Sequence, residues 1–282
     1  GPILLVYLML TIRPLTTHDE ILAVEQLQRD AWGVPEVDVV PLHMLITPPR
    51  HGGLLLGAFD GERMAGFVFG FLGLTPDGRL KHCSHMAGVH PDYRGQHVGY
   101  LLKLAQRQHV LAQGLDLITW TFDPLEARNA WLNFHKLGVV CNTYIRHLYG
   151  AMRAAINVGL PSDRFEVAWW IRSQRVEERL RAGEISPSPG PSLGGRGEGG
   201  VVGEISPSPG PSLGGRGVGS LLIEIPANFQ AIKATDMELA LRWRLESRER
   251  FEDAFARGYV VVDLVKHGDA LAYVLETADG EQ

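Results

Sequence analysis

A predicted strand, a short polar loop and an amphipathic helix follow one another without interruption over residues 80–113. The strand ends at Val89 and the helix begins near Val98. N–H groups at a helix N-terminus have no intrahelical partner and carry partial positive charge. Gly95 and Gly99 let an anion approach the main chain closely. The segment is typical of a phosphate-binding turn, and equally of a plain strand-to-helix connection in which the glycines serve only backbone geometry.

Two common nucleotide-binding motifs are excluded for this loop. It is not a Walker loop, because no GK[ST] follows it, and it is not a Rossmann fingerprint, because GxGxxG is absent. Arg94 adds a cation next to the glycines. A phosphate bound here would therefore belong to another class of ligand.

Strand and helix patterns alternate through residue 172. A strand over 11–15 and a helix over 18–31 come first, and Asp60-Gly61 predicts a hairpin. A strand over 117–122, a helix over 125–137 and a strand over 164–172 follow the helix over 98–113. We expect an apolar face on that helix, formed by Leu101, Leu104, Ala105 and Val110. The order predicts an α/β (α+β mixed) fold, a mixed sheet with helices on its faces.

The C-terminal part has a different composition. GEISPSPGPSLGGRG begins at Gly183 and again at Gly203, and it has no apolar face to bury. This composition predicts a disordered Pro/Gly/Ser repeat linker over 183–219. A strand, an amphipathic helix over 236–257 and a hairpin across His267-Gly268-Asp269 follow. We expect a C-terminal strand-helix-hairpin extension over 220–282, packed on the first domain.

Charge and cysteine content exclude several functions. The net charge is −5, with no basic face for nucleic acid and no polybasic run for a membrane. The two cysteines, Cys83 and Cys141, have no CxxC spacing, so we expect no metal site. Lone thiols suit a reducing compartment, which predicts a cytoplasmic protein.

The loop motif resembles a known family. VHPDYRGQHVGYLLK, residues 89–103, looks like the acyl-coenzyme A-binding motif of the GNAT superfamily of N-acyltransferases. Arg94 and Gly99 match the first and last anchors of that motif, whereas His97 stands where the family has its middle glycine. A second pattern, after the strand over 117–122, matches at Ala130, Lys136 and Gly138.

The resemblance implies a GNAT-like domain over 9–175 with a largely antiparallel sheet flanked by helices. It implies acetyl-CoA, or another acyl-CoA such as succinyl-CoA, as co-substrate, and no metal. Asn129 and Asn133, four residues apart, are expected on one helix face, either toward the pantetheine arm or as a solvated polar stripe. The implied coenzyme A-binding residues are Ala87, Gly88, Val89, Arg94, Gly95, Gln96, His97, Val98, Gly99, Tyr100, Asn129, Asn133 and Lys136.

The resemblance also implies direct attack of an amine on the thioester. In a strand of period two, Cys83, His85 and Ala87 share one face. We expect His85 to be the base, because imidazole titrates near neutral pH; the alternative is a hydrogen-bonded structural histidine. Phe134 stands where the family often has the tyrosine that protonates the thiolate. Tyr144 is the candidate acid that remains, with Tyr149 and water as alternatives.

Two functions stay open at this point. The first is an N-acyltransferase that acetylates, or succinylates, the amine of a small molecule such as an amino acid. The second is a non-catalytic CoA-binding regulatory or protein-interaction module, which His97 and Phe134 favour. We expect a small-molecule amine acceptor and no nucleic-acid or membrane partner; the sequence gives no oligomeric state.

Overall fold

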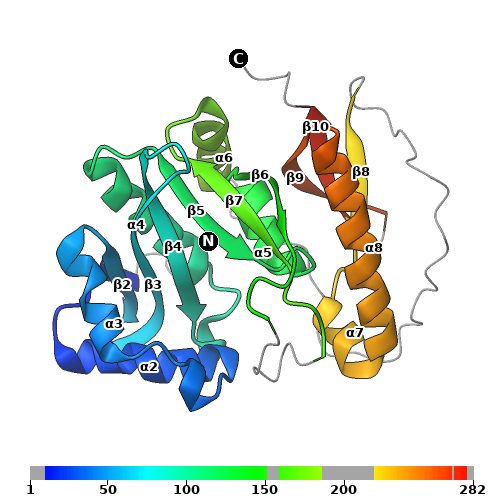
Figure 1. Cartoon of the computed structure of the whole chain (residues 1–282). Coiled ribbons are helices and arrows are strands. Elements are labelled where there is room, and N and C mark those ends of the chain that lie inside the picture. The colour runs from blue at the N-terminus through cyan, green and yellow to red at the C-terminus, as the bar shows by residue number, and fades with distance from the viewer. Residues whose placement is uncertain (1–9, 151–158, 186–218, 269, 278–282) are drawn as a thin grey trace. The chain divides into compact units, whose positions relative to one another are not determined.

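A computed structural model of the chain describes residues 10–150, 159–185, 219–268 and 270–277 (Figure 1). The described chain forms two compact units. The first contains residues 10–120 and 168–173, and the second contains residues 121–150, 159–167, 174–185, 219–268 and 270–277. The boundary between Trp120 and Thr121 falls inside the strand Leu117–Phe122, so this strand has residues in both units.

The first unit is built on a sheet of four consecutive antiparallel strands. These are β1 (Leu10–Pro14), β2 (Leu54–Asp60), β3 (Arg63–Leu74) and β4 (Leu80–Val89). The Asp60-Gly61 turn joins β2 and β3 as predicted, with Gly61 at φ 58°. A fifth strand, β5 (Leu117–Phe122), pairs with β4 in the parallel direction.

Helices cover both faces of this sheet (Figure 1). On one face, α2 (His18–Trp32) and α3 (Leu42–Ile46) pack against Phe67 and Phe69 of β3. On the other face, Val98 and Leu102 of α4 (Val98–Ala112) pack against Val68. The shorter turns of the unit are η1 (Glu36–Asp38), η2 (Pro48–His51) and η3 (Pro91–Tyr93).

The second unit contains a further antiparallel set of strands. β6 (Val140–Ile145) pairs with β9 (Tyr259–His267), which pairs with β10 (Ala270–Thr277), and β10 pairs with β8 (Leu221–Ile225). Its helical segments are α5 (Ala127–Ala130), the wider π-helical turn η4 (Trp131–Lys136), α6 (Gln174–Ile185), α7 (Phe229–Thr235) and α8 (Met237–Ala256). The strand β7 (Arg164–Trp170) has residues in both units.

The predicted fold class is confirmed: the sheet is mixed, largely antiparallel and flanked by helices. The helix over 174–185 was not predicted, because its charged sequence has few apolar positions. It contains the first three residues of the expected linker, and residues 186–218 of that linker lie outside the described residues. The division into a domain over 9–175 and an extension over 220–282 stays a prediction.

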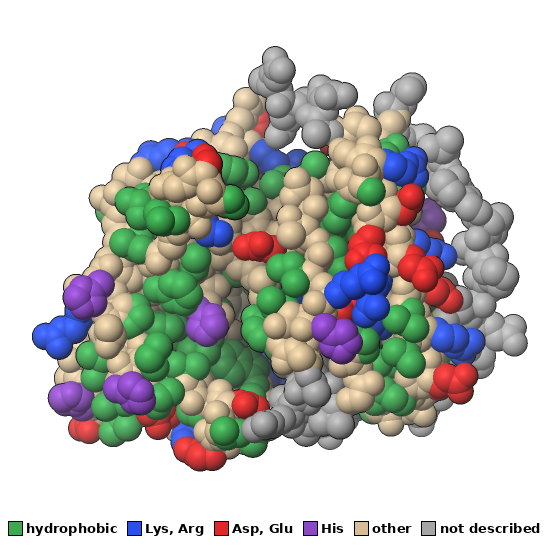
Figure 2. Space-filling model, viewed as in Figure 1, with side chains coloured by type: hydrophobic (Ala, Val, Ile, Leu, Met, Phe, Trp, Pro, Cys, Tyr) green, Lys and Arg blue, Asp and Glu red, His purple; other side chains and the backbone are tan. Residues whose placement is uncertain are grey.

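The surface of the first unit is partly apolar. Figure 2 shows hydrophobic side chains, with histidines among them, over the elements at its N-terminal end. Leu22, Val37 and Met44 are among the exposed ones. In the part of the chain that the structure describes, none of the helices has the length and apolar character that a membrane span needs.

Candidate functional site

The site lies where β4 and β5 separate. The two strands pair only through His82 with Ile118 and Cys83 with Thr119. Beyond these pairs β4 continues to Val89, paired with β3 alone among the described strands. Backbone groups on the β5 side of this stretch therefore have no ladder partner from β5, which leaves N–H donors for another group to bind.

A β-bulge lies in the same stretch of β4. Met86 pairs with Phe69 and Ser84 pairs with Gly70, so His85 is the extra residue in the ladder. The bulge corrects the expected side-chain alternation. Ala87 pairs with Val68, whose side chain packs on the α4 face, whereas His85 lies beside Phe69 on the α2 face. His85 and Ala87 therefore do not share a face, because the extra residue shifts the period by one.

The loop after β4 has the backbone shape of a glycine-rich turn. Gly95 has φ 80°, and His97 has φ 61° in the left-handed region that glycine favours. The first N–H group of α4 bonded to a preceding carbonyl is that of Leu101, which donates to His97 O at 3.0 Å. The N–H groups of Val98 and Gly99 precede it at the positive end of the helix dipole. A histidine thus occupies the middle position without removing the turn.

Side chains hold the loop in place from both ends. Arg63 pairs with Asp92 at 2.5 Å, and the Tyr93 hydroxyl donates to Asp60 Oδ2 at 3.1 Å. Arg94, the predicted phosphate ligand, donates from Nη2 to the carbonyl of Ala31 at 2.6 Å. A guanidinium has five N–H donors, so this bond leaves capacity for an anion. It also fixes Arg94 at the C-terminus of α2.

Close packing of α4 on the sheet depends on glycine. A Cβ atom on Gly66 would lie 2.8 Å from the Gly88 carbonyl oxygen and 2.9 Å from a Val98 methyl carbon. No side chain fits there, so the N-terminus of α4 lies directly against β3 and β4. The helix start and the separated part of β4 are neighbours for this reason.

His85, the predicted base, is an exposed ring at the bulge. It packs at an angle against Phe69 and Phe71, with ring centroids 6.2 and 5.7 Å away. Partial burial lowers the pKa of His85 below its usual value, so the ring is neutral at neutral pH. Within the described residues no hydrogen bond to this ring is found. The environment suits a proton acceptor better than a structural histidine.

The structure shows a buried polar cluster that the sequence analysis missed. Lys103 Nζ donates to Ser84 Oγ at 2.7 Å and to Gln106 Oε1 at 3.2 Å, and it lies 3.8 Å from the centre of the Trp120 ring. Ser84 Oγ donates to the same Gln106 oxygen at 3.0 Å. Ser84 and Trp120 directly follow the last β4–β5 pair. The lysine amine therefore spans the two strands at the point where they separate.

The cluster corrects part of the predicted apolar face of the helix: Val110 is buried and Ala105 packs on the core as expected, but polar residues share the buried side. The buried residues of α4 include Lys103, Gln106 and Arg107, whereas Leu101 and Leu104 are only partly buried. Polar side chains are tolerated there because they are hydrogen-bonded: the Arg107 guanidinium donates to Ile171 O at 2.7 Å. A search for apolar residues alone does not detect a buried helix face that contains lysine, glutamine and arginine.

His82, the weaker base candidate, belongs to the same cluster. Its Nε2 lies 3.1 Å from Gln106 Nε2, and since the amide nitrogen is a donor, Nε2 accepts and Nδ1 carries the proton. Burial, then the Lys103 charge, lowers the pKa of His82 to about 3. A ring so deeply buried and so weakly basic has no route to an acceptor amine.

Tyr144, the predicted acid, lies in the second unit. Its hydroxyl donates to Asp163 Oδ2 at 2.9 Å, and Arg248 binds the same carboxylate at 2.8 and 3.1 Å. Burial, then the Asp163 charge, raises the pKa of Tyr144. The proton of this hydroxyl is held by a carboxylate that is itself ion-paired, which disfavours its release to another group.

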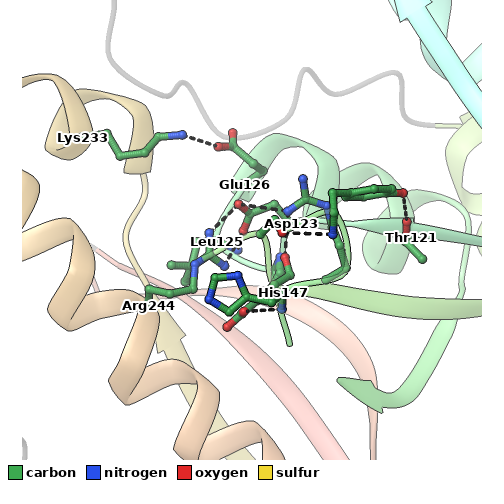
Figure 3. Close-up of polar contacts among 12 residues, drawn as sticks. Thr121, Asp123, Leu125, Glu126, His147, Lys233 and Arg244 are labelled. Atoms are coloured by element: carbon green, nitrogen blue, oxygen red, sulfur yellow. Dashed lines mark hydrogen bonds and ion pairs between the residues drawn. The ribbon is translucent and has the colours of Figure 1, made fainter. Parts of the chain in front are cut away.

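A network of buried charges surrounds this region of the second unit (Figure 3). Arg244 binds Asp123 at 2.9 and 2.5 Å, and Lys233 lies 3.7 Å from Glu126. The Leu125 N–H donates to Asp123 Oδ1 at 2.9 Å. These bonds join α8 and α7 to the turn after β5, which is a structural task, and each carboxylate has its cation.

The other predicted residues of the second unit have mixed surroundings. Asn129 is exposed, whereas Asn133 is buried in η4, where the spacing of an ordinary α-helix does not apply. Burial lowers the pKa of Lys136. Phe134 is fully buried and meets the rings of Phe165 and Tyr273 edge to face. Its position is therefore part of an aromatic core.

No family model matches the sequence, and no curated protein matches it significantly. Solved structures do resemble part of the chain. The ribosomal-protein-S18-alanine N-acetyltransferase of Escherichia coli is 19% identical, with 58% of this chain and 96% of that chain covered and a TM-score of 0.47. A GNAT-family acetyltransferase of Streptococcus pneumoniae is 16% identical (56% and 97% covered, TM-score 0.43). An N-acetyltransferase of Staphylococcus aureus Mu50 is 13% identical (58% and 99% covered, TM-score 0.46).

Proposed function

We propose that the chain is an acyl-CoA-dependent N-acyltransferase of the GNAT type. The observation that carries the proposal is the separation of β4 from β5 after Cys83 and Thr119, next to a strand–loop–helix turn with Gly95 and His97 at positive φ. The turn supplies N–H donors for a pyrophosphate, and the separated strand supplies N–H donors for an acyl thioester. One ligand with both groups is an acyl-coenzyme A.

The residues of the turn would hold the diphosphate. Val98 and Gly99 present helix N-terminal N–H groups, Gly95 allows close approach, and Arg94 adds positive charge. Gln96, whose amide donates to the Asp92 carbonyl, keeps the turn closed. Asn129, Asn133 and Lys136 remain proposed contacts to the coenzyme on the strength of the motif alone.

The residues of β4 would serve the reaction. The stretch Ala87–Val89, with Gly88 inside it, offers backbone donors to polarise the thioester carbonyl. His85, raised out of the ladder by the bulge, accepts the proton of the attacking amine as the C–N bond forms. Phe71 beside it provides an apolar flank for the acceptor. We propose acetyl as the transferred group and a small-molecule amine as the acceptor.

Calorimetric titration with acetyl-CoA and succinyl-CoA tests the site. The unchanged chain is expected to bind a thioester, and Arg94→Glu is expected to weaken binding at least tenfold through charge repulsion with phosphate. Arg50→Glu, an exposed arginine of η2, is the matched control and should bind like the unchanged chain. Absence of binding by the unchanged chain would exclude the proposed function.

A turnover assay separates the enzyme from a non-catalytic coenzyme A-binding module. Release of free thiol is followed with a panel of amines, since each transfer liberates one coenzyme A. Binding without thiol release above the uncatalysed rate, over the whole panel and with both thioesters, would favour the module. Phe134 favours the non-catalytic module, because this residue is buried and has no hydroxyl that could protonate a thiolate.

A further inference from the structure

The buried Lys103 is a cation without a carboxylate partner. Within the described residues no Asp or Glu lies at ion-pair distance from its Nζ atom; the contacts are Ser84, Gln106 and the face of Trp120. Lys103 retains only 5% of its surface exposure. A buried ammonium without a counter-charge is costly, so burial favours the neutral amine. The position of Lys103 indicates where a counter-charge arises during the proposed reaction.

Lys103 lies at the junction of β4 and β5. Ser84 and Trp120 are the first residues beyond the last pairs of the two strands, and the amine touches both. A thioester held by the separated part of β4 breaks its C–S bond in this region and leaves a thiolate. We propose that Lys103 is the proton donor to this departing coenzyme A thiolate, an inference that rests on the proposed acyltransferase function.

The reaction balances with residues of this chain. The amine nitrogen forms the C–N bond, the C–S electron pair goes to sulfur, and sulfur takes a proton from the Lys103 ammonium. The proton lost by the amine goes to the His85 ring. After product release His85 returns its proton to water, and the neutral Lys103 amine takes one up. The net change is one thioester and one amine converted to one amide and one thiol.

The surroundings of Lys103 suit a proton donor. Burial lowers its pKa to about 7, so ammonium and amine are both populated at neutral pH. His82 on β4 lies close enough for the Lys103 charge to lower its pKa, and Arg107 follows Lys103 by four residues on α4. A neutral imidazole and a guanidinium carry no negative charge, so neither is a counter-charge for the ammonium. No competing acid is needed from Tyr144.

The test uses the full chain with acetyl-CoA and an amine that the turnover assay identifies as an acceptor. The rate constant kcat is measured at saturating substrates as the pH is raised. Lys103 must carry a proton in order to donate it, so kcat is expected to fall as the pH rises through the pKa of Lys103. In Lys103→Met this basic limb should disappear while acetyl-CoA affinity stays within about threefold. Turnover should fall about 100-fold with little change in KM.

Controls make the result specific. Lys266→Met removes an exposed lysine of β9 and should leave the basic limb of kcat and the turnover unchanged. Ser84→Ala removes the first hydrogen-bond acceptor of the Lys103 ammonium with little loss of volume, so the basic limb of kcat is expected at lower pH in this variant. Should Lys103→Met fail to fold, Ser84→Ala decides the matter alone, and an unchanged basic limb in that variant overturns the proposal.

Two further outcomes would overturn the inference without touching the proposed function. The first is turnover with the same basic limb of kcat in the unchanged chain and in Lys103→Met. The second is a preference for succinyl-CoA that Lys103→Met abolishes, since the ammonium would then bind the acyl carboxylate. No binding of either thioester to the unchanged chain would instead exclude the proposed function itself.

Discussion

The Arg244 guanidinium donates two hydrogen bonds to the Asp123 carboxylate, and both side chains are buried. Removing one partner leaves the other charge buried without compensation. We expect Asp123→Asn to lower the free energy of unfolding by about 3–5 kcal/mol, measured by urea denaturation. Asp253→Asn, which breaks the exposed pair with Arg257, is the control and should cost less than about 1 kcal/mol. Equal losses in the two variants would contradict this account.

The buried Lys103 amine makes stability depend on pH. Its pKa falls from 10.5 to about 7 on folding, so between these pH values the unfolded chain binds more protons than the folded one. Stability therefore rises as the pH is raised from 7 to 10.5, by roughly 3–5 kcal/mol from this group. In Lys103→Met this contribution is absent, and the difference between the two urea midpoints should narrow steadily over that window. A constant difference would show that Lys103 keeps an ordinary pKa.

The left-handed backbone at His97 predicts the outcome of restoring glycine there. A side chain in this conformation costs the folded state about 1–2 kcal/mol. Glycine removes this strain, but its greater conformational freedom in the unfolded chain offsets part of the gain in stability. His97→Gly is expected to stabilise the protein by up to about 1 kcal/mol and to bind acetyl-CoA at least as tightly as the unchanged chain. Gly95→Ala, at φ 80°, should destabilise it instead. Thermal unfolding and calorimetry measure both effects.

The proposed base predicts a pH–rate profile. His85 must be neutral to accept a proton, and burial lowers its pKa, so the acidic limb of kcat/KM should lie below pH 6.5. His85→Ala should reduce kcat about 100-fold or more with little effect on acetyl-CoA binding. His51→Ala, an exposed histidine of η2, should keep the full rate and the same limb. A limb that persists in His85→Ala would assign the titration to another group.

Much of the first unit could be predicted from local sequence. The strand over 80–89 and the strand over 117–122 have the predicted bounds, and the helix at Val98 begins where expected. Period-two and helical patterns report which segments form strands and helices, because each element must bury one side. The same patterns predict the strand–loop–helix turn, because consecutive residues form it and no distant partner is needed to set its backbone shape.

The remaining features depend on partners distant in sequence. The bulge at His85 arises from the pairing of β4 with β3, which strict alternation does not report. The Lys103 cluster needs Ser84 of β4 and Trp120 of β5, which come from two strands on either side of α4 in the sequence. A lysine among leucines looks like a solvated position unless its hydrogen-bond partners are known. Tertiary contacts of this kind decide the chemistry of the site.

One extra residue in β4 has a consequence for how such chains are compared and altered. Upstream of His85, even-numbered side chains face α4; downstream, odd-numbered ones do, because Ser84 and Ala87 share that face. Counting residues across this position therefore misassigns the side of every later one. Deleting His85 would turn the bulge into a regular ladder, because Ser84 and Met86 already pair with the consecutive residues Gly70 and Phe69. Every later residue up to Val89 would keep its partner and its face, so this one deletion would remove the proposed base and leave the rest of the strand in register.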